Sequence, residues 1–484
     1  MEWIKAHWSH DNAVFLLSVI WSVYAVVVSV WVLMQRRAPV ATLSWLLAMA
    51  VLPVGGLGIY YFFGPQRFKR QRIKRLRSRR SSRVRTSAAR LRERIPAAPE
   101  RLHQVAQLVT RTADFPVSSA THMELLVGGA RTFDRILEAV RQARHHVHLE
   151  YYIFEPDQTG SALMQALIER ARAGVKVRML VDSLGSKRIH RRFYAPLVEA
   201  GGEFVFFHPT RIGRRLRPVI NFRTHRKIVV CDGRVAFTGG VNITDEEDER
   251  VMAHAYHDVH LRLEGPVVNW LQTVFLEDWA YALERHPLSK PKALDDLLPD
   301  VDEGPHAVQV VSSGPDSRLE AIHRVHVAAI NAASERVWLT TPYFVPTEAA
   351  MTALTNAALR GVDVQLLVPE KSDSFIVTAA ARSYFDELLA CGAKVHEYRD
   401  RMLHSKTLVV DDSMAIIGTA NFDHRSFFLN YEVCVIAYGY KLNSDLARQF
   451  TEDLNNARQV STARRQRFFL RLGDSIARLC SPLL

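Results

Sequence analysis

The sequence Thr224-His225-Arg226-Lys227-Ile228-Val229-Val230-Cys231-Asp232 has a second copy of its pattern in Leu403-His404-Ser405-Lys406-Thr407-Leu408-Val409-Val410-Asp411. Each copy reads His, any residue, Lys, four residues, Asp. Farther along, a glycine stands seven residues after each Asp and an asparagine seventeen residues after each His, at Gly239, Gly418, Asn242 and Asn421. The apolar residues after each Lys predict a buried strand, and two-residue alternation places each His on the same side as its Lys.

The segments before each motif also repeat. Hydrophobic patterning predicts a strand over 147–154, a helix over 160–173 and a strand over 175–181, and then the same order over 337–344, 348–360 and 362–368. Such alternation is typical of α/β domains. We therefore predict an α/β fold with two copies of one domain in pseudo-twofold arrangement, over 121–286 and 307–460. The acidic, proline-containing segment 287–306 is the expected linker.

The charge of the 484-residue chain is local. Its net charge of +13 is matched by the segment 67–94, which holds fourteen Lys or Arg and one acid, and the rest of the chain has 49 basic and 49 acidic residues. A neutral body with one basic segment argues against a general nucleic-acid surface and favours a local anionic partner. We interpret 67–120 as a basic collar and linker, either bound to anionic headgroups or solvated as a tether.

Residues 1–66 are predicted to form an N-terminal membrane hairpin. The stretches 13–34 and 40–63 carry no charge, and the first would span about 33 Å as a helix, enough for a bilayer. A signal peptide and a buried core hairpin are the competing interpretations, and a re-entrant hairpin is a third. The collar directly after the hairpin predicts a multi-pass protein with its C-terminal side in the cytoplasm.

Cysteine usage and the C-terminus complete the organisation. Four cysteines stand far apart without a CxxC or a His/Cys cluster, so we expect no metal and no cofactor, and a reducing compartment. The segment 461–484 mixes arginines with large apolar residues and predicts an amphipathic helix. That helix either lies at a membrane interface or packs on the body of the protein.

The duplicated motif suits attack on a phosphodiester. Such an ester needs its oxygens neutralised, a nucleophile, and a proton for the leaving oxygen. Two imidazoles divide the last two tasks, one neutral and one protonated, while two lysines and two asparagines are positioned to bind the oxygens. We expect one site at the pseudo-twofold axis, where the motif glycines let backbone approach the ligand. By spacing, Glu432 is expected to orient His404, and Asp258 to orient His225.

With these features the sequence resembles the phospholipase D superfamily, and within it the bacterial cardiolipin synthases. The resemblance rests on the two motifs, on Gly239-Gly240-Val241-Asn242 and Gly418-Thr419-Ala420-Asn421, on the N-terminal hairpin, and on Tyr343-Phe344-Val345-Pro346, Ala381-Arg382-Ser383-Tyr384 and the C-terminal end. It covers nearly the whole chain. It implies two α/β sandwich domains sharing one site, and transfer of a phosphatidyl group through a phosphohistidine.

The resemblance also implies roles for residues. His225 is the expected nucleophile and His404 the acid and later base, with Lys227, Lys406, Asn242 and Asn421 around the phosphate, whereas Asp232 and Asp411 are expected to be structural. Candidate substrate-binding residues are Tyr343, Ser383, Tyr384 and the basic-loop residues Arg215 and Arg217, a loop that is either a headgroup site or solvated.

The implied reaction condenses two phosphatidylglycerols into cardiolipin and glycerol in the bacterial inner membrane. The expected partners are phosphatidylglycerol and other anionic membrane lipids, without nucleic acid. The alternatives are a phospholipase D-type hydrolase, a transferase that uses phosphatidylethanolamine as donor, a nuclease, and a membrane scaffold without chemistry.

Overall fold

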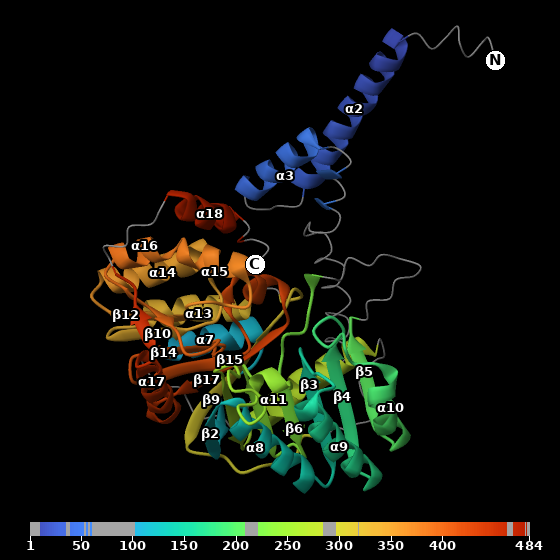
Figure 1. Ribbon diagram of the computed structural model, residues 1–484, viewed down its shortest axis with the longest axis vertical. Coiled ribbons are helices and arrows are strands. Elements are labelled where there is room, and N and C mark those ends of the chain that lie inside the picture. The colour runs from blue at the N-terminus through green and yellow to red at the C-terminus, as the bar shows by residue number, and fades with distance from the viewer. Residues whose placement is uncertain are drawn as a thin grey trace, which may run out of the picture. The chain divides into compact units, whose positions relative to one another are not determined.

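The computed structural model describes residues 10–34, 39–52, 55–56, 59–60, 102–208, 221–283, 297–317, 319–461, 468–479 and 481 (Figure 1). The chain forms two compact units. One comprises residues 1–71 with 213–221, and the other comprises 72–212 with 222–484. The second unit holds both copies of the motif.

The first half of this larger unit is built on a seven-stranded sheet. Its strands follow the spatial order β2-β8-β7-β6-β3-β4-β5. The neighbours β3, β4 and β5 are parallel, and the pairs on the β2 side of β3 are antiparallel. The strands are β2 (His122–Val127), β3 (His146–Tyr151), β4 (Lys176–Asp182), β5 (Glu203–Phe207), β6 (Ile228–Cys231), β7 (Val235–Gly239) and β8 (Val259–Glu264).

The second half repeats this topology. Its nine-stranded sheet has the order β1-β9-β17-β15-β14-β10-β12-β13-β18, which is the first sheet's order with one extra strand at each edge. The expected duplication is therefore present in the strand order as well as in the motifs. The strands are β1 (Ser118–Ala120), β9 (His306–Ser313), β10 (Arg336–Thr340), β12 (Asp363–Pro369), β13 (Lys394–Tyr398), β14 (Thr407–Val410), β15 (Met414–Gly418), β17 (Glu432–Tyr438) and β18 (Ala457–Gln459), and β11 (Phe344–Val345) pairs separately with β16 (Phe422–Asp423).

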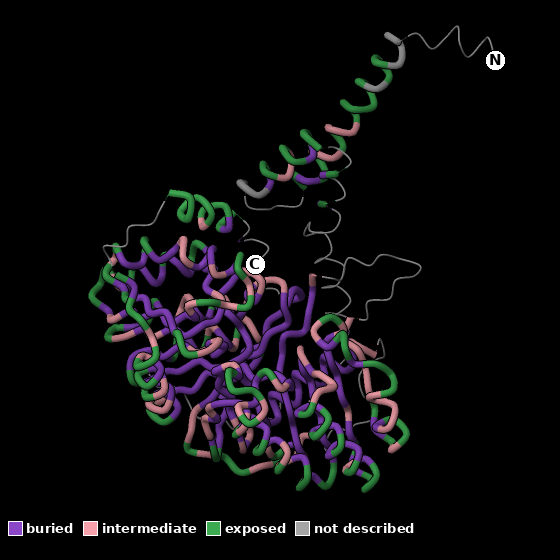
Figure 2. Tube along the Cα trace, viewed as in Figure 1, coloured by how far each residue is buried: buried purple, intermediate pink, exposed green. Residues whose placement is uncertain are grey.

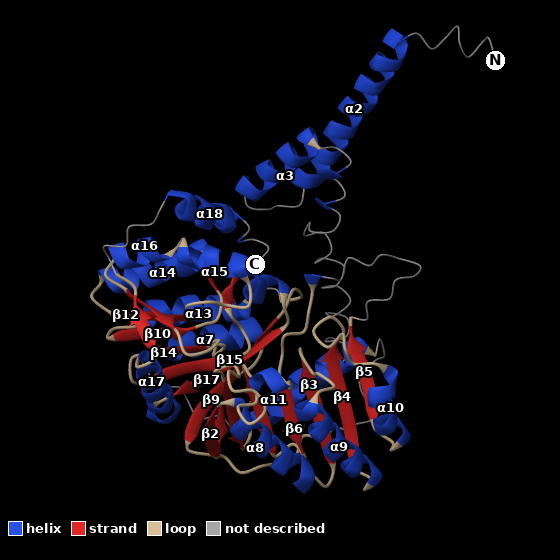
Figure 3. Ribbon diagram, viewed as in Figure 1, coloured by secondary structure: helices blue, strands red, loops and turns tan. Residues whose placement is uncertain are grey.

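Helices cover both faces of each sheet (Figure 3). Helices α8 (Gly129–Gln142), α9 (Gln158–Arg172) and α10 (Arg191–Glu199) pack on the first sheet, and α13 (Ala321–Ala332), α14 (Glu348–Leu359), α15 (Phe375–Arg382) and α16 (Phe385–Ala390) on the second. Helix α17 (Tyr440–Leu454) lies on the opposite face of the second sheet and also contacts β2. Helix α11 (Val267–Ala282) contacts strands of both sheets.

Strand β6 shows how the sequence determines these layers. Val229 and Cys231 belong to the core under α8 and α9, whereas Ile228 and Val230 belong to the core around α11, as two-residue alternation requires. The core around α11 also contains residues of β9, β15 and β17. One continuous apolar interior therefore joins the two halves, and Figure 2 shows the buried residues concentrated in their strands.

The segment expected to be a linker before the first half contains ordered structure. Helix α7 (His103–Ala113) packs against α13 and β9, and β1 pairs antiparallel with β9. Both elements thus belong to the second half, although they precede the first half in the chain. The amphipathic pattern of α7 buries Val105, Ala106 and Val109 there. Residues 67–101 of the collar, 284–286 of the expected first domain and 287–296 of the expected linker lie outside the described residues.

The N-terminal unit contains two apolar helices, α2 (His10–Leu33) and α3 (Pro39–Val51). Among the described residues, only α2 contains a segment long and apolar enough to cross a membrane, Val14–Leu33. The helix expected over 40–63 corresponds to α3, which ends at Val51, and residues 55–56 and 59–60 are again helical among those described. At about 20 Å, α3 is too short to span a bilayer alone.

Candidate active site

The two motifs meet because each is hydrogen-bonded to a segment of the opposite half. The N–H of His225 donates to the Tyr431 carbonyl at 2.9 Å, and the Tyr431 N–H donates to the Arg223 carbonyl at 2.8 Å. In the second copy, the N–H of His404 donates to the His257 carbonyl at 2.8 Å. Each motif therefore lies beside the segment that leads into β17 or β8 of the other half, as a pseudo-twofold axis requires.

This exchange decides which carboxylate meets which imidazole. His225 Nδ1 lies 3.0 Å from Glu432 Oε2, and Glu432 is buried and accepts further bonds from Thr419 Oγ1 at 2.5 Å and Asn430 Nδ2 at 3.1 Å. A carboxylate that accepts from Nδ1 leaves the Nε2 lone pair of a neutral imidazole available for attack. The expectation that Glu432 orients His404 is wrong, because Glu432 binds the histidine of the other half.

The second pair is formed in the same way. His404 Nδ1 lies 2.6 Å from Asp258 Oδ2, and Lys406 Nζ lies 3.5 Å from the same oxygen. The expected pairing of Asp258 with His225 is likewise wrong. Asp258 also lies against Gly240, where a Cβ atom would meet its Oδ1 at 2.1 Å. Gly240 thus makes room for the Asp258 carboxylate just before β8. Gly239 and Gly418, which were expected to let backbone approach the ligand, instead lie against the backbone of adjacent strands, where a Cβ atom would meet the Cα of His260 and of Cys434 at 2.6 Å.

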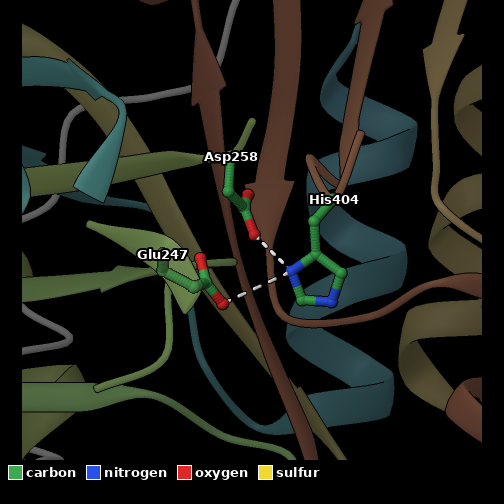
Figure 4. A group of neighbouring side chains, drawn as sticks. All are labelled: Glu247, Asp258 and His404. Carbon is green, nitrogen blue, oxygen red and sulfur yellow. Dashed lines mark hydrogen bonds and ion pairs between the residues drawn. The ribbon is translucent and has the colours of Figure 1, made fainter. Parts of the chain in front are cut away.

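Glu247 is a site residue that the sequence analysis did not identify. Its Oε1 accepts from Asn242 Nδ2 at 2.8 Å and lies 3.7 Å from His404 Nδ1. Figure 4 shows Glu247 and Asp258 both directed at the same imidazole nitrogen. Glu247 stands five residues after Asn242, where the second copy has Ser426 five residues after Asn421. The mismatch between the two copies concealed it from an argument based on repetition.

The two halves therefore have different titratable groups around their histidines. Glu247 Oε1 accepts the Asn242 N–H at 3.0 Å, and Ser426 Oγ accepts the Asn421 N–H at 3.1 Å, so the two side chains are equivalent in position. A carboxyl group on one side replaces a hydroxyl on the other. Among the described residues, His404 thus lies beside two carboxyl groups, Asp258 and Glu247, whereas His225 pairs with Glu432.

Burial shifts the titration of the charged groups. Burial and the charge of Lys406 lower the pKa of His404 to about 4, although Asp258 acts in the opposite direction. Burial also lowers the pKa of His225, although Glu432 raises it in part. Burial and the adjacent Asp258 raise the pKa of Glu247 to about 8. Burial and the charge of Lys406 lower the pKa of Lys227 to about 7. Burial therefore disfavours the charged form of each of these groups.

The lysines and asparagines of the motif are anchored within their own half. Lys227 Nζ donates to the His225 carbonyl at 3.0 Å, and Lys406 Nζ donates to the His404 carbonyl. Both ammonium groups are buried. Asn242 and Asn421 each have a side-chain oxygen without a partner among the described residues. These positions keep two cations and two amides close to the paired histidines.

Asp232 and Asp411 bind backbone N–H groups of their own halves rather than the motif histidines His225 and His404. Asp232 accepts the backbone N–H groups of Arg144, His145 and His146 at 2.8 to 2.9 Å. Asp411 makes the equivalent bonds to the segment before β10. Each ties the turn after a motif strand to the start of the adjacent strand, which is a structural contact.

The candidate substrate-binding residues separate into three groups. The Tyr343 hydroxyl donates to Asp373 at 2.6 Å. Burial raises the pKa of Tyr343, and the nearby Asp373, Asp423 and Tyr256 raise it further. The Ser383 hydroxyl donates to the Ala380 carbonyl of α15, and the buried Tyr384 hydroxyl forms a hydrogen bond with Ser481 near the C-terminus. These hydrogen bonds do not involve the motif residues. Arg215 and Arg217 lie outside the described residues.

Comparisons with known proteins agree with this geometry. A family model described as "Cardiolipin synthase, PLD-like domain" matches residues 136–279 and 327–454, and a phospholipase D-nuclease N-terminal model matches 22–65. Cardiolipin synthase 1 of Bacillus cereus is 37% identical over 98% of this chain and 95% of its own length. The chain belongs to the cardiolipin synthase family of the phospholipase D superfamily.

Other relatives support the same assignment. A cardiolipin synthase of Geobacillus kaustophilus is 39% identical over 97% of this chain and 94% of its own length. The crystal structure of phosphatidylserine synthase from Haemophilus influenzae shares the fold, with a TM-score of 0.61 at 14% identity, over 79% of this chain and 100% of that structure. Family membership makes this chain a phosphatidyltransferase that acts on phospholipid and associates with a membrane.

One group of side chains in the site has the composition of a metal site. Glu247, Asp258 and His404 offer ligand atoms within 4.8 Å of one another. However, Asp258 already accepts from His404, and the Lys406 ammonium lies 3.5 Å from the same carboxylate. The donor set is therefore already supplied with positive charge, and a dication here would be repelled by Lys406.

Proposed function

We propose that this family member condenses two phosphatidylglycerol molecules into cardiolipin and glycerol, using His225 as the nucleophile. The observation that carries the proposal is the exchange of carboxylates between the halves, with Glu432 on His225 and Asp258 on His404. Two histidines, each held by a different carboxylate at one site, provide for attack and for proton transfer in a single phosphoryl-centred reaction.

In the first step His225 Nε2 attacks the phosphorus of one phosphatidylglycerol. Glu432 holds the Nδ1–H and stabilises the positive charge that develops on the ring. Lys227 and Lys406 neutralise the phosphate oxygens, a task for which buried ammonium groups are effective in a low dielectric. His404, in its protonated form, donates its proton to the departing glycerol oxygen. The phosphatidyl group is now bound to His225.

The assignment of His404 as the acid follows the family resemblance. Burial lowers the pKa of His404 to about 4 even though Asp258 beside its Nδ1 favours the charged ring. The negative charge of the bound phosphodiester must therefore supply the remaining stabilisation of the protonated form. His225, hydrogen-bonded to Glu432, acts in its neutral form as the nucleophile.

In the second step a hydroxyl of another phosphatidylglycerol attacks the phosphohistidine. His404, now neutral, removes the hydroxyl proton, and His225 leaves. Water is the competing acceptor and would give phosphatidic acid, so hydrolysis of the same intermediate is the alternative reaction. The second donor alternative, phosphatidylethanolamine, would require the same histidines and differ in the leaving group.

Product analysis tests the proposal. Purified enzyme incubated with phosphatidylglycerol alone is expected to yield cardiolipin and glycerol in equal amounts, measured by mass spectrometry and a glycerol assay. Phosphatidic acid as the main product would indicate the hydrolase. Cardiolipin formed only after addition of phosphatidylethanolamine would show that the donor is wrong.

We propose in addition that the protein is a multi-pass protein of the bacterial inner membrane with both catalytic halves in the cytoplasm. The proposal is supported by the apolar helix α2, by the uncharged stretch 40–63 that contains α3, and by the fourteen basic residues within 67–94. Removing residues 1–66 is expected to impair retention of the enzyme on membranes and to leave some turnover on detergent-dispersed lipid. A folded truncation without any turnover in detergent would show that these helices help to form the site.

A further inference from the structure

The C-terminal helix α18 (Phe468–Leu479) turns an apolar side toward solvent. Phe469 is 82% exposed and Leu479 is 80% exposed. Successive residues of a helix are about 100° apart around its axis. Five of the exposed apolar residues of α18 fall within one arc of about 100°, and Leu470 lies outside it. The five are Phe468, Phe469, Leu472, Ile476 and Leu479. Ala477, the buried residue of α18 among those described, lies outside this arc, about 130° from its centre. Figure 2 shows the helix exposed along nearly all of its length.

The opposite side of α18 fixes the helix to the protein. The Arg478 guanidinium lies 4.2 Å from the centre of the Tyr384 ring, and its Nη2 lies 3.7 Å from Glu387. Beyond the helix, the hydroxyls of Ser481 and Tyr384 lie 3.0 Å apart. An amphipathic helix that stabilised only the body would bury its apolar side, and this helix does the reverse.

Helix α15, on which α18 packs, adds to the exposed apolar surface. Phe375 and Ile376 at its first turn are 85% and 49% exposed. The preceding loop leads to the active site, because Asp373 accepts from the Tyr343 hydroxyl and Tyr343 lies near Tyr256. The Tyr256 ring lies 5.7 Å from the His404 ring. The exposed apolar surface and the surroundings of His404 are thus connected through one short loop.

We propose that the docking face, defined as the exposed apolar side of α18 together with Phe375 and Ile376, binds the surface of an anionic bilayer. Exposed aromatic and aliphatic residues on a helix that also carries arginines are the features of interfacial helices. Arg471 is exposed outside the apolar arc, on the flank of the helix, in position for anionic headgroups. The bilayer contact would be additional to the N-terminal helices. Its use in delivering lipid to His404 rests on the proposed function.

Two other occupants are outcomes of the test. The apolar helices of the same chain, or a second copy of the chain, would also cover this face. The bilayer is favoured because a family member acts on lipid and because Arg471 complements anionic headgroups. The segment Val14–Leu33 of α2 has no acidic residue with which this arginine could pair.

A local probe distinguishes these occupants without measuring activity. In full-length protein with Cys391 and Cys480 changed to Ser, Phe469→Cys carries an environment-sensitive fluorophore, and Val198→Cys on α10 is the control. Cys231 and Cys434 are buried and should not react. In vesicles of phosphatidylcholine with phosphatidylserine, the label at 469 is expected to shift to shorter wavelength and to be quenched by nitroxide-bearing lipids, more than in phosphatidylcholine alone.

The control at 198 should show neither effect. A label at 469 that shifts without quenching by lipid nitroxides would mean that protein covers this face, and a label with no shift would mean that the face stays in water. Either result overturns the proposal. Because neither depends on turnover, each is distinguishable from failure of the proposed reaction.

A matched pair of charge substitutions gives a second test. Leu472 and Val198 are 45% and 47% exposed, on α18 and α10 respectively. Leu472→Asp is expected to raise the KM for vesicle-borne phosphatidylglycerol about tenfold, and to leave turnover of a monomeric short-chain substrate unchanged. Val198→Asp should change neither. Equal effects of the two substitutions on the vesicle substrate would refute the docking face.

Discussion

Replacing Glu432 with Gln removes the negative charge of this side chain and turns one of its acceptor oxygens into a donor NH₂ group, while keeping its shape. Glu432 accepts from His225 Nδ1, Thr419 Oγ1 and Asn430 Nδ2. An amide has only one oxygen, so in Glu432→Gln an NH₂ group must face one of these donors. If it faces His225, the ring is driven into the tautomer that carries its proton on Nε2. That tautomer has no lone pair for attack on phosphorus.

The size of the effect follows from two losses. A hydrogen bond to a charged acceptor contributes about 2 kcal/mol. Stabilisation of the positive ring that forms during attack contributes a similar amount in a buried site, because Glu432 is fully buried. A total of about 4 kcal/mol corresponds to a decrease of about 10³-fold in kcat. Folding should be retained, since the substitution keeps the side-chain volume and the Asn430 bond, and the Thr419 hydroxyl can accept from the new NH₂ group.

The matched variant is Asp258→Asn, which makes the same change beside His404. With phosphatidylglycerol both variants should be slow. With a phosphatidyl ester of p-nitrophenol, whose leaving group needs no proton, Asp258→Asn should release p-nitrophenol in a rapid burst and accumulate phosphohistidine. Glu432→Gln should show no burst. Stopped-flow absorbance and peptide mass spectrometry make the measurement.

Two results would refute this reasoning. A burst in Glu432→Gln and none in Asp258→Asn would reverse the roles of the two histidines. Near-normal turnover of phosphatidylglycerol in either variant, with an unchanged melting temperature, would show that the carboxylates do not orient the imidazoles during the reaction.

Three further predictions follow from the site. Asp232→Asn should lower the free energy of unfolding by about 2 kcal/mol, measured by chemical denaturation, with kcat nearly unchanged, because Asp232 binds backbone N–H groups before β3. The raised pKa of Glu247, about 8 against 4.5, means that the folded protein holds a proton that the unfolded chain loses, so this residue reduces stability as pH rises from about 4.5 to 8. Glu247→Gln should therefore gain stability relative to the parent between pH 5 and pH 8.5, and melting curves showing a pH-independent difference would contradict this. Chelation of divalent ions should leave the chemical step intact because Lys227 and Lys406 supply positive charge, and activity restored only by one stoichiometric ion would contradict it.

The fold could be predicted well where the signal was local or repeated. The strand–helix–strand segments around 147–181 and 337–368 appear in the structure as β3, α9 and β4 and as β10, α14 and β12, within a few residues of the expected bounds. Apolar alternation and helical periodicity act over short distances, so they are written in the sequence. Helix α7 and β1 were missed because their partners lie in β9 and α13, some two hundred residues later.

The active site was predicted in part. Both motifs, Asn242, Asn421 and the two orienting carboxylates were identified, but the carboxylates were assigned to the wrong histidines. Sequence spacing favoured partners within one half, whereas the structure joins residues 207 and 146 positions apart. Glu247 was not found, because its counterpart in the other copy is Ser426 and repetition gave no signal.

By itself, the sequence determined that the protein is a duplicated α/β chain with an apolar N-terminus and two equivalent sets of His, Lys and Asn. These properties depend on side-chain periodicity and on exact spacing, both of which are readable without coordinates. Only the tertiary structure decided that His225 binds Glu432 and that His404 binds Asp258 with Glu247 nearby. The physical reason is that packing the two sheets around α11 brings the end of each half against the motif of the other, and a contact made across that interface leaves no trace in local sequence.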